Sequence, residues 1–449
     1  MGMDHSRTLS LVLGLIRSGD ATTRPELIRR TDLGRALVSQ RVEDALEAGL
    51  IEELDEGVSK GGRPARTLRV RADRGRVLTA VFGASRVAIS LTDLAGRVET
   101  ESYTAWDINN GPEASLSLLR DAAAAMLVPT APLWAVVIGV PGPVSVSIGS
   151  PVHPPIMAGW HAYPVREWLE REYGVPAFVE NDANLMALGT WQRLRRQSGD
   201  DVVFIKAGTG LGAGIIADGE LVRGDRGAAG DFGHTTVAEY SRVQCRCGNF
   251  GCLEALAGGW ALARDGYTAA FTRDSTFLQD RIARQGGLTF EDIVAGSLAA
   301  DPVSRELIDR SGTLIGASLA TVVNLLNPAT VFVGGGLALA GRPFFEAIAE
   351  QVRRRSQPLA TERLVVRNVP LNHREGNIGA AVLALDALLD PRMLSRWVDR
   401  GSPRGVSAQA EPDSEHQPSD SAAPATPGPK LRLDPLEDAP VPQASRSAS

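Results

Sequence analysis

Two stretches of the chain, RVLTAVFGASRVAISLTDLAGRV at residues 76–98 and DVVFIKAGTGLGAGIIADGELV at residues 201–222, share one pattern. Each has an apolar strand-like run, a turn with glycine, a second apolar run, a tight Asp/Gly turn and the start of a third strand. Repeated units of this kind predict a fold of two lobes with a cleft between them. Two unrelated hairpins could also look alike by chance, so the pattern needs support from other motifs.

The sequence around the repeats alternates apolar runs, Gly-rich turns and amphipathic helices, which is typical of an α/β fold. Composition changes near residues 76 and 400, so we expect an N-terminal domain at 1–76 and a body at 77–395. Its lobes are expected at about 77–195 and 196–395. Residues 400–449 are rich in Pro, Ser and Ala and have few large apolar side chains, which predicts a disordered tail.

Charge and cysteine usage narrow the function classes. The net charge of -6 excludes a uniformly basic nucleic-acid binder but allows a local basic patch. The N-terminus lacks the cationic segment and cleavage site of a signal peptide, and no apolar run is long enough to span a membrane. The three cysteines all lie between Cys245 and Cys252, an odd and clustered set that favours metal ligation in a reducing cytosol. We therefore expect a cytoplasmic protein with no membrane partner.

The N-terminal domain has the pattern of a helix-turn-helix. Residues 23–26, Thr-Arg-Pro-Glu, form a capping box with proline in the first turn, which predicts a helix over 24–30. A turn at 31–34 separates it from a second helix over 35–48, which Gly49 would end. The second helix has one apolar stripe, formed by Val38, Val42, Ala45 and Leu46. In a helix-turn-helix, this second helix enters the major groove of DNA.

The predicted DNA contacts come from this second helix and from a following wing. Its exposed polar positions are expected to be Arg35, Ser39, Gln40 and Arg41. Arg can bind guanine edges, Gln can bind adenine, and Ser can bind phosphate. A basic Gly-containing turn at 58–66 would form the wing, with contacts from Lys60, Arg63 and Arg66. A helical bundle that serves dimer packing is the alternative. A double-stranded operator bound by a homodimer, or by a dimer of dimers, would present this small basic surface twice.

A second cluster of chemistry-bearing residues lies in the stretch HTTVAEYSRVQCRCGNFGCLE at 234–254. His234, Cys245, Cys247 and Cys252 form the Cys₃His set of closed, structural Zn²⁺ sites. Four protein ligands leave no position for an activated water, so the predicted site is structural. Free buried cysteines beside an unrelated histidine, or an internal disulfide, are the alternatives.

Several motifs together resemble the ROK family of repressors and sugar kinases. They are GAAGDFGH at 227–234, CRCGNFGCLE at 245–254, IGVPGP at 138–143, VENDAN at 179–184, and NLLNP at 324–328 leading into GGG at 334–336. The resemblance extends from the first helix to about residue 390. It implies an N-terminal winged helix-turn-helix, as in the regulator branch, and an actin-like ATPase body of the hexokinase and ribonuclease H type.

The resemblance also implies roles for particular residues. Asn181 would bind sugar, and Asp182 would occupy the sugar-binding and catalytic-base position. Three further sugar contacts would be Asp231, His234 and Glu254, although kinases of the family usually have Glu where Asp231 stands. Nucleotide phosphate would lie against two Gly-rich turns, formed by Gly208, Thr209 and Gly210 and by Gly334, Gly335 and Gly336.

One position departs from the kinase pattern. The first phosphate loop of the kinases resembles Asp-x-Gly-Gly-Thr, whereas this chain has Val-Phe-Gly-Ala-Ser at 81–85, and Val81 cannot bind Mg²⁺. We therefore expect a regulator, in the simplest case a repressor, that senses a sugar or sugar phosphate without ATP/Mg²⁺ and without catalysis. An active ATP-dependent sugar kinase with a DNA-binding extension is one alternative. A ligand-independent DNA-binding protein whose body only dimerises or docks is another.

Overall fold

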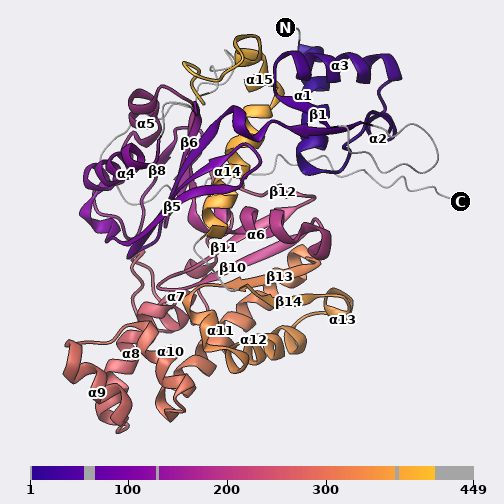
Figure 1. The fold of residues 1–449 in the computed structure, drawn as a ribbon. Coiled ribbons are helices and arrows are strands. Elements are labelled where there is room, and N and C mark those ends of the chain that lie inside the picture. The colour runs from indigo at the N-terminus through magenta and orange to yellow at the C-terminus, as the bar shows by residue number, and fades with distance from the viewer. Residues whose placement is uncertain (1–2, 55–65, 128–130, 370–373, 410–449) are drawn as a thin grey trace, which may run out of the picture. The chain divides into compact units, whose positions relative to one another are not determined.

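Three helices and a hairpin form the N-terminal domain of the computed structural model, which describes residues 3–54, 66–127, 131–369 and 374–409 (Figure 1). Their bounds are α1 Met3–Ser18, α2 Arg24–Arg30, α3 Arg35–Glu47, and the antiparallel strands β1 Ile51–Leu54 and β2 Thr67–Val70. The two predicted helices are confirmed, and the Thr23 side chain caps α2 by accepting from the Glu26 N–H. The Glu26 carboxylate accepts from the N–H of Thr22, one residue earlier than a capping box on Thr23 requires. Lys60 and Arg63 lie outside the described residues.

The body contains two five-stranded sheets with the same strand order. The first runs β5 Val98–Ala105, β4 Arg86–Asp93, β3 Arg76–Phe82, β6 Leu133–Val140 and β9 Ala177–Asn181. The second runs β12 Glu220–Leu221, β11 Leu211–Ala217, β10 Val202–Ala207, β13 Thr330–Gly334 and β14 Val365–Asn368. In each sheet the first three strands are antiparallel, and the last two are parallel to the third. The predicted α/β repeat is therefore confirmed.

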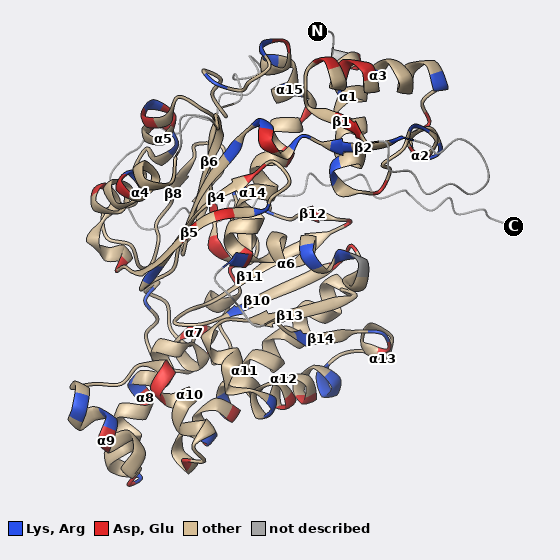
Figure 2. Ribbon diagram, in the orientation of Figure 1, with Lys and Arg blue, Asp and Glu red and all other residues tan. Residues whose placement is uncertain are grey.

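Helices accompany each sheet, as βαβ connections require. Those between the strands of the first sheet are α4 Pro112–Met126 and α5 Val165–Tyr173, with the short strands β7 Val144–Ser145 and β8 Ser150–Pro151. Between β12 and β14 the chain forms α7 Leu253–Ala257, α8 Gly259–Thr272, α9 Thr276–Gln285, α10 Phe290–Leu298, α11 Pro302–Leu326, α12 Arg342–Arg355 and α13 Pro358–Thr361. Charged residues are frequent on the outer helices, whereas β10 and β13 are almost entirely uncharged (Figure 2). The central strands β10 and β13 therefore lie in the apolar interior of the body.

Two helices connect the sheets. Helix α6, Asp182–Ser198, packs on β10 and β11 of the second sheet, and α14, Arg374–Leu389, packs on β3, β4 and β6 of the first (Figure 1). The two helices also pack on each other, so one apolar core continues from the first sheet to the second and into the N-terminal domain. The predicted second lobe, 196–395, thus includes a helix that packs on the first sheet.

The chain remains ordered past the predicted start of the tail. Helix α15, Pro391–Trp397, is followed by residues 398–409, where the buried Val406 supplies an apolar anchor. The Glu170 carboxylate accepts from the Ser407 hydroxyl at 2.7 Å and from the Ala408 N–H at 2.6 Å. The prediction of disorder from residue 400 is therefore wrong for 400–409, and the remainder lies outside the described residues. Within the described part of the chain, no helix combines the length and apolarity needed to cross a bilayer.

Candidate functional site

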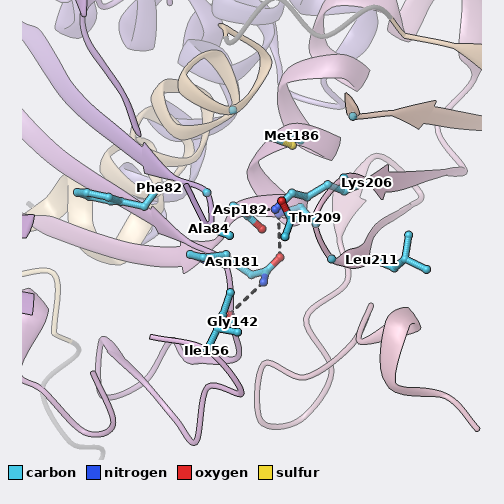
Figure 3. Close-up of a pocket in the computed structure, with 18 of the residues that line it drawn as sticks. Phe82, Ala84, Gly142, Ile156, Asn181, Asp182, Met186, Lys206, Thr209 and Leu211 are labelled. Carbon is cyan, nitrogen blue, oxygen red and sulfur yellow. Dashed lines mark hydrogen bonds and ion pairs between the residues drawn. The ribbon is translucent and has the colours of Figure 1, made fainter. Parts of the chain in front are cut away.

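A cavity of about 480 Å³ lies where the turns of the two sheets meet, and its size suits a small ligand. The first lobe contributes the turn after β3, the Pro-Gly-Pro turn after β6 and the start of α6. The second contributes the end of β10, the 227–234 segment and the turn after β13. Figure 3 shows side chains from both lobes facing one another across this space. The cavity brings together all five predicted sugar-site residues, namely Asn181, Asp182, Asp231, His234 and Glu254.

Asn181 is the N-cap of α6, which limits what it can offer a ligand. Its side-chain oxygen accepts from the N–H groups of Ala183 and Asn184, at 2.9 and 3.3 Å. Its amide nitrogen donates to the Gly142 carbonyl at 3.0 Å (Figure 3). One amide N–H is left over from these three bonds, so Asn181 would act toward a sugar hydroxyl mainly as a donor.

Asp182 lies at the first position of α6, with a side chain that is only 3% exposed. Burial raises the pKa of this carboxyl, and the Lys206 ammonium opposes that rise. The two groups form an ion pair in the cavity (Figure 3).

Lys206 belongs to none of the motifs that predicted the site. It lies on β10, four positions before Gly210, as the single charged residue of the strand VVFIKA. A lone lysine in an otherwise apolar strand, just before a Gly-rich turn, is a signal that could have pointed to the cavity. Its ammonium pairs with the Asp182 carboxylate, so a ligand hydroxyl that approaches Asp182 would have to compete with Lys206.

Glu254 holds in place the Gly-rich turn after β10, residues 208–210, which is called the second turn because it belongs to the second sheet. One carboxylate oxygen accepts from the Leu211 N–H at 2.9 Å, and the other from the indole N–H of Trp260 at 3.1 Å. Two further backbone bonds join the same segments, from Gly259 to the Gly208 carbonyl and from Trp260 to the Thr209 carbonyl. Glu254 therefore positions the turn and borders the cavity at the same time.

The predicted metal ligands converge. The ligand atoms of His234, Cys245, Cys247 and Cys252 all lie within 4.8 Å of one another. Cys245 Sγ lies 3.5 Å from His234 Nδ1, and Cys247 Sγ lies 3.7 Å from Cys252 Sγ. Tetrahedral Zn²⁺ with ordinary bond lengths requires about 3.6 Å for a sulfur–nitrogen edge and about 3.8 Å for a sulfur–sulfur edge. The cluster can therefore hold a metal ion of this kind.

His234 connects the metal cluster to the cavity. Its Nδ1 faces Cys245, while its Nε2 faces the Asp231 carboxylate at 4.0 Å. A metal on Nδ1 would fix the ring and leave an Nε2 proton directed toward that carboxylate. Gly251 allows this knuckle to close, because it has φ +70° and a Cβ there would collide with the Ala238 carbonyl oxygen. Glycine is needed there on both counts.

The predicted nucleotide residues divide into two groups. Gly208, Thr209, Gly210, Gly335 and Gly336 line the cavity. Gly334 does not, because it is the last residue of β13 and pairs with Lys206 of β10. Val81, the replaced carboxylate position, is 6% exposed and faces the cavity between Gly139 and Gly376. The position that Val81 occupies is therefore apolar.

The predicted DNA contacts that the structure describes differ in exposure. On α3, Arg35 and Gln40 are exposed and Ser39 is half-buried, and Arg66 is exposed at the base of the hairpin. Arg41 is 5% exposed and donates to the Asp44 carboxylate at 2.6 Å, beside His5 of α1. The prediction that Arg41 is exposed is wrong. Helix α1, which the sequence analysis did not place, covers that side of α3.

Comparison with known proteins gives a family and full-length relatives. The model of the ROK family matches residues 80–387. The xylose repressor of Caldicellulosiruptor bescii is 29% identical over 391 residues, which cover 84% of this chain and 95% of that protein. The glucokinase of Halalkalibacterium halodurans is 30% identical over 246 residues, which cover 55% of this chain and 74% of the glucokinase.

The similar solved structures are also of two kinds, a transcriptional regulator and sugar kinases. A ROK family transcriptional regulator, described as a homologue of the Escherichia coli Mlc protein, has a TM-score of 0.74 and 26% identity, with 89% of this chain and all of that one covered. A ROK family glucokinase from Streptomyces griseus, in complex with glucose and AMPPNP, has a TM-score of 0.60 and 29% identity. That match covers 69% of this chain and 99% of the glucokinase. The regulator thus accounts for a larger part of the chain than the kinase does.

Proposed function

The chain belongs to the ROK family, and we propose that it is a DNA-binding transcriptional repressor whose kinase-like body senses a sugar or sugar phosphate without phosphorylating it. One observation carries this proposal. The cavity keeps the polar groups that suit a sugar, while its metal-nucleotide position is the apolar Val81 and its base position is paired with Lys206.

The size of the expected effects favours a sensor over an enzyme. Loss of charge neutralisation on a transferring phosphoryl group costs several orders of magnitude in rate. Lys206 would compete with a sugar hydroxyl for Asp182 and so weaken general-base catalysis, which typically contributes about 10²- to 10⁴-fold. Sugar binding needs neither function, because hydroxyls require only donors and acceptors at the right places.

The DNA-binding part of the proposal rests on α3 and on the hairpin that follows it. Arg35, Ser39 and Gln40 would read the major groove, and Arg66 would contact the backbone beside the wing. A homodimer would present α3 twice, at the spacing of two half-sites. Sugar binding that changes the angle between the two lobes would change this spacing and lower the affinity for DNA.

The metal part of the proposal is a structural Zn²⁺ held by His234, Cys245, Cys247 and Cys252. The separations from Cys245 to His234 and from Cys247 to Cys252 match tetrahedral edges, and all four donors come from the protein. When bound, the ion would stiffen the 234–252 knuckle. His234 would then keep a fixed distance to Asp231, and α7, which follows Cys252, would hold Glu254 against the second Gly-rich turn.

Three measurements on the purified full chain test the function. Selection of bound fragments from genomic DNA should recover a small set of sites with two related half-sites. Thermal shifts against a panel of sugars and sugar phosphates should show stabilisation by at least one, because a ligand of the native state raises its stability. That ligand should weaken binding to the selected DNA. No thermal shift across the panel would favour a body that only dimerises or docks.

An ATP-dependent sugar kinase is the second candidate, favoured by the intact turn at Gly208, Thr209 and Gly210. Labelled ATP with Mg²⁺ and each sugar of the panel separates the two functions. We expect no turnover above background. Robust turnover that disappears in Asp182→Asn would overturn the sensor proposal.

A further inference from the structure

Helices α6 and α14 both start at the cavity and extend to the N-terminal domain. Asp182 begins α6 inside the cavity, and Arg195 follows about 20 Å further along the helix axis. Glu375 and Gly376 of α14 also line the cavity, and Asp386 follows about 15 Å beyond Gly376. Each helix is therefore long enough to join the ligand site to a distant surface.

The far ends of both helices hold the same short segment of the N-terminal domain. Arg195 of α6 donates to the Asp20 carboxylate, and Arg17 at the end of α1 donates to Asp386 of α14. Asp20 also accepts from the Ser18 hydroxyl at 2.7 Å, which fixes the turn after α1. Residues 17–20 lead directly into α2 and α3, so a shift of this segment moves the predicted DNA-reading helix.

Burial makes the Arg17 contact costly to lose. The Arg17 side chain is 16% exposed, and burial, with the nearby Arg195 charge, lowers the pKa of the guanidinium to about 10. A buried cation needs its partner carboxylate, so a displacement of Asp386 would draw Arg17 with it.

The helices cross each other with no room for independent movement. A Cβ at Gly189 of α6 would collide with the Glu375 carbonyl oxygen, and a Cβ at Gly379 of α14 would collide with the Leu185 carbonyl oxygen. Their backbones are thus in direct contact. Such packing forces the two helices to move together, since an interior of this density does not deform gradually.

The third connection between the domains does not reach the cavity. Helix α15 packs on α1, and Trp397 of α15 packs on Trp134 of β6, but neither tryptophan lines the cavity. This contact would anchor the N-terminal domain whatever the state of the ligand site.

We propose that α6 and α14 form a relay that carries the state of the cavity to residues 17–20 and so to α3. This inference rests on the proposed function and names its route of regulation. A ligand hydroxyl that engages Asp182 would compete with Lys206 and shift the start of α6. The crossing at Gly189 and Gly379 would pass the shift to α14, and the two ion pairs would pass it to the turn after α1.

The test measures transmission directly, by hydrogen exchange in the full-length protein. Asp182→Asn serves as the disturbance in the cavity, so no ligand has to be known. It is introduced into the wild type, into an uncoupled variant with Arg195→Gln and Asp386→Asn, and into a control variant with Arg342→Gln. Arg342 pairs with Glu346 on the exposed face of α12, far along the chain from the relay. Both relay substitutions keep a polar side chain and remove its charge, and Asp386→Asn also keeps its size.

In the wild-type and control backgrounds, we expect Asp182→Asn to change exchange in residues 17–30 by about tenfold. In the uncoupled background, we expect a change below about twofold. When Arg195→Asp and Asp20→Arg take the place of Arg195→Gln in that background, the reversed ion pair should restore part of the response. An equal response in the uncoupled background, no response in the wild type, or a loss of response in the control would each overturn the relay. Protection in β10 and β13 reports whether each variant is folded.

A parallel measurement keeps the relay distinct from the proposed function. D-glucose and D-xylose are added at saturating concentration to wild type and to the uncoupled variant, and affinity for the selected DNA is measured. A sugar that binds both but weakens DNA binding only in the wild type supports the relay. Equal weakening in both overturns it while leaving the sensor intact. If neither sugar binds, the proposed function loses support and the hydrogen-exchange result still decides the relay.

Discussion

The two sheets of the body have the same strand order, yet their first turns have opposite chemistry. The turn after β3, residues 83–85, follows the apolar Val81 and bonds to residues 106 and 108 of its own lobe. The turn after β10, residues 208–210, follows Lys206 and is bonded to Glu254, Gly259 and Trp260 beside the Cys/His cluster. Repetition of a fold therefore does not preserve a site. The polar groups that suit a ligand come from the start of α6, from the 227–234 segment and from α7 beside the second turn.

The Cys/His cluster beside the second turn should give the largest loss of stability when it is mutated. Cys252 is fully buried, and Cys252→Ser removes one ligand from the cluster that adjoins α7. We expect a loss of more than about 4 kcal/mol in the free energy of unfolding, since loss of a structural metal is among the most costly changes. Urea denaturation measures it, and mass spectrometry of the native protein should find one Zn²⁺ per chain in the wild type and none in the variant. Tyr240→Ser, at a 95% exposed position of the same segment, is the control. Equal stability of Cys252→Ser and wild type would show that the cluster holds no structural ion.

The first turn should respond to a charge in its apolar wall. Val81→Asp places a carboxylate at a 6% exposed position, and we expect a loss of about 3 kcal/mol in urea denaturation. Val81→Thr adds only a hydroxyl at similar volume, so its loss should be nearer 1 kcal/mol. Retention of full stability by Val81→Asp, with a thermal shift from Mg²⁺ and ATP, would mean that the first turn still forms a metal-nucleotide site.

Glycines provide a matched comparison of the two turns. A Cβ at Gly210 would lie 2.5 Å from the Glu254 carboxylate, whereas a Cβ at Gly83 or at Gly208 meets nothing closer than 3.6 Å. We expect Gly210→Ala to lower the free energy of unfolding by about 1–2 kcal/mol, because it strains the bond from Leu211 to Glu254. Gly83→Ala and Gly208→Ala should stay within about 0.5 kcal/mol of wild type. A similar loss at all three positions would contradict this difference between the turns.

The smallest effect is the pH dependence of Asp182. Burial raises the pKa of this carboxyl in the folded state, although Lys206 opposes the rise. The folded state therefore binds the proton more tightly than the unfolded chain. This group adds stability as the pH falls toward its ordinary value of 3.8, and the gain is lost as the pH rises through the folded-state pKa.

Urea denaturation between about pH 7 and about pH 4.5 would measure how much stability the Asp182 carboxyl adds as the pH falls. Relative to Asp182→Asn, the wild type should gain stability on acidification. Asp225→Asn, at an exposed position, should run parallel to wild type and serves as the control. Parallel curves for wild type and Asp182→Asn would contradict the raised pKa.

The sequence predicts the repeat, the two helices around the turn at 31–34 and the metal cluster because each depends on local spacing. Turn residues, capping residues and ligand spacing act within a few positions, so they can be read directly from the chain. The residues of the 181–182 and 227–234 motifs, which the resemblance to the ROK family singles out, fall in one cavity.

The failures share one physical cause, since they all depend on contacts between distant segments. Arg41 has the spacing of an exposed residue, but α1 covers it. Val406 and Ser407 lie in a tail-like composition, but Val406 joins the core cluster that contains Trp397, and the Glu170 carboxylate of α5 accepts from Ser407. Gly334 belongs to a Gly-rich motif, yet pairing with β10 retains it in the sheet. Helix α14 follows the second lobe in sequence and packs on the first.

The contact between Trp134 and Trp397 has a practical consequence. The two rings are almost fully buried, with centroids 5.1 Å apart, and Trp134 packs against Gly75 on the segment that joins the N-terminal domain to the body. A Cβ at Gly75 would collide with the Trp134 ring, so the chain passes directly over this indole. The protein therefore contains an intrinsic fluorophore pair at its interdomain junction. Its emission and near-ultraviolet dichroism offer an optical record of junction movement with no label attached.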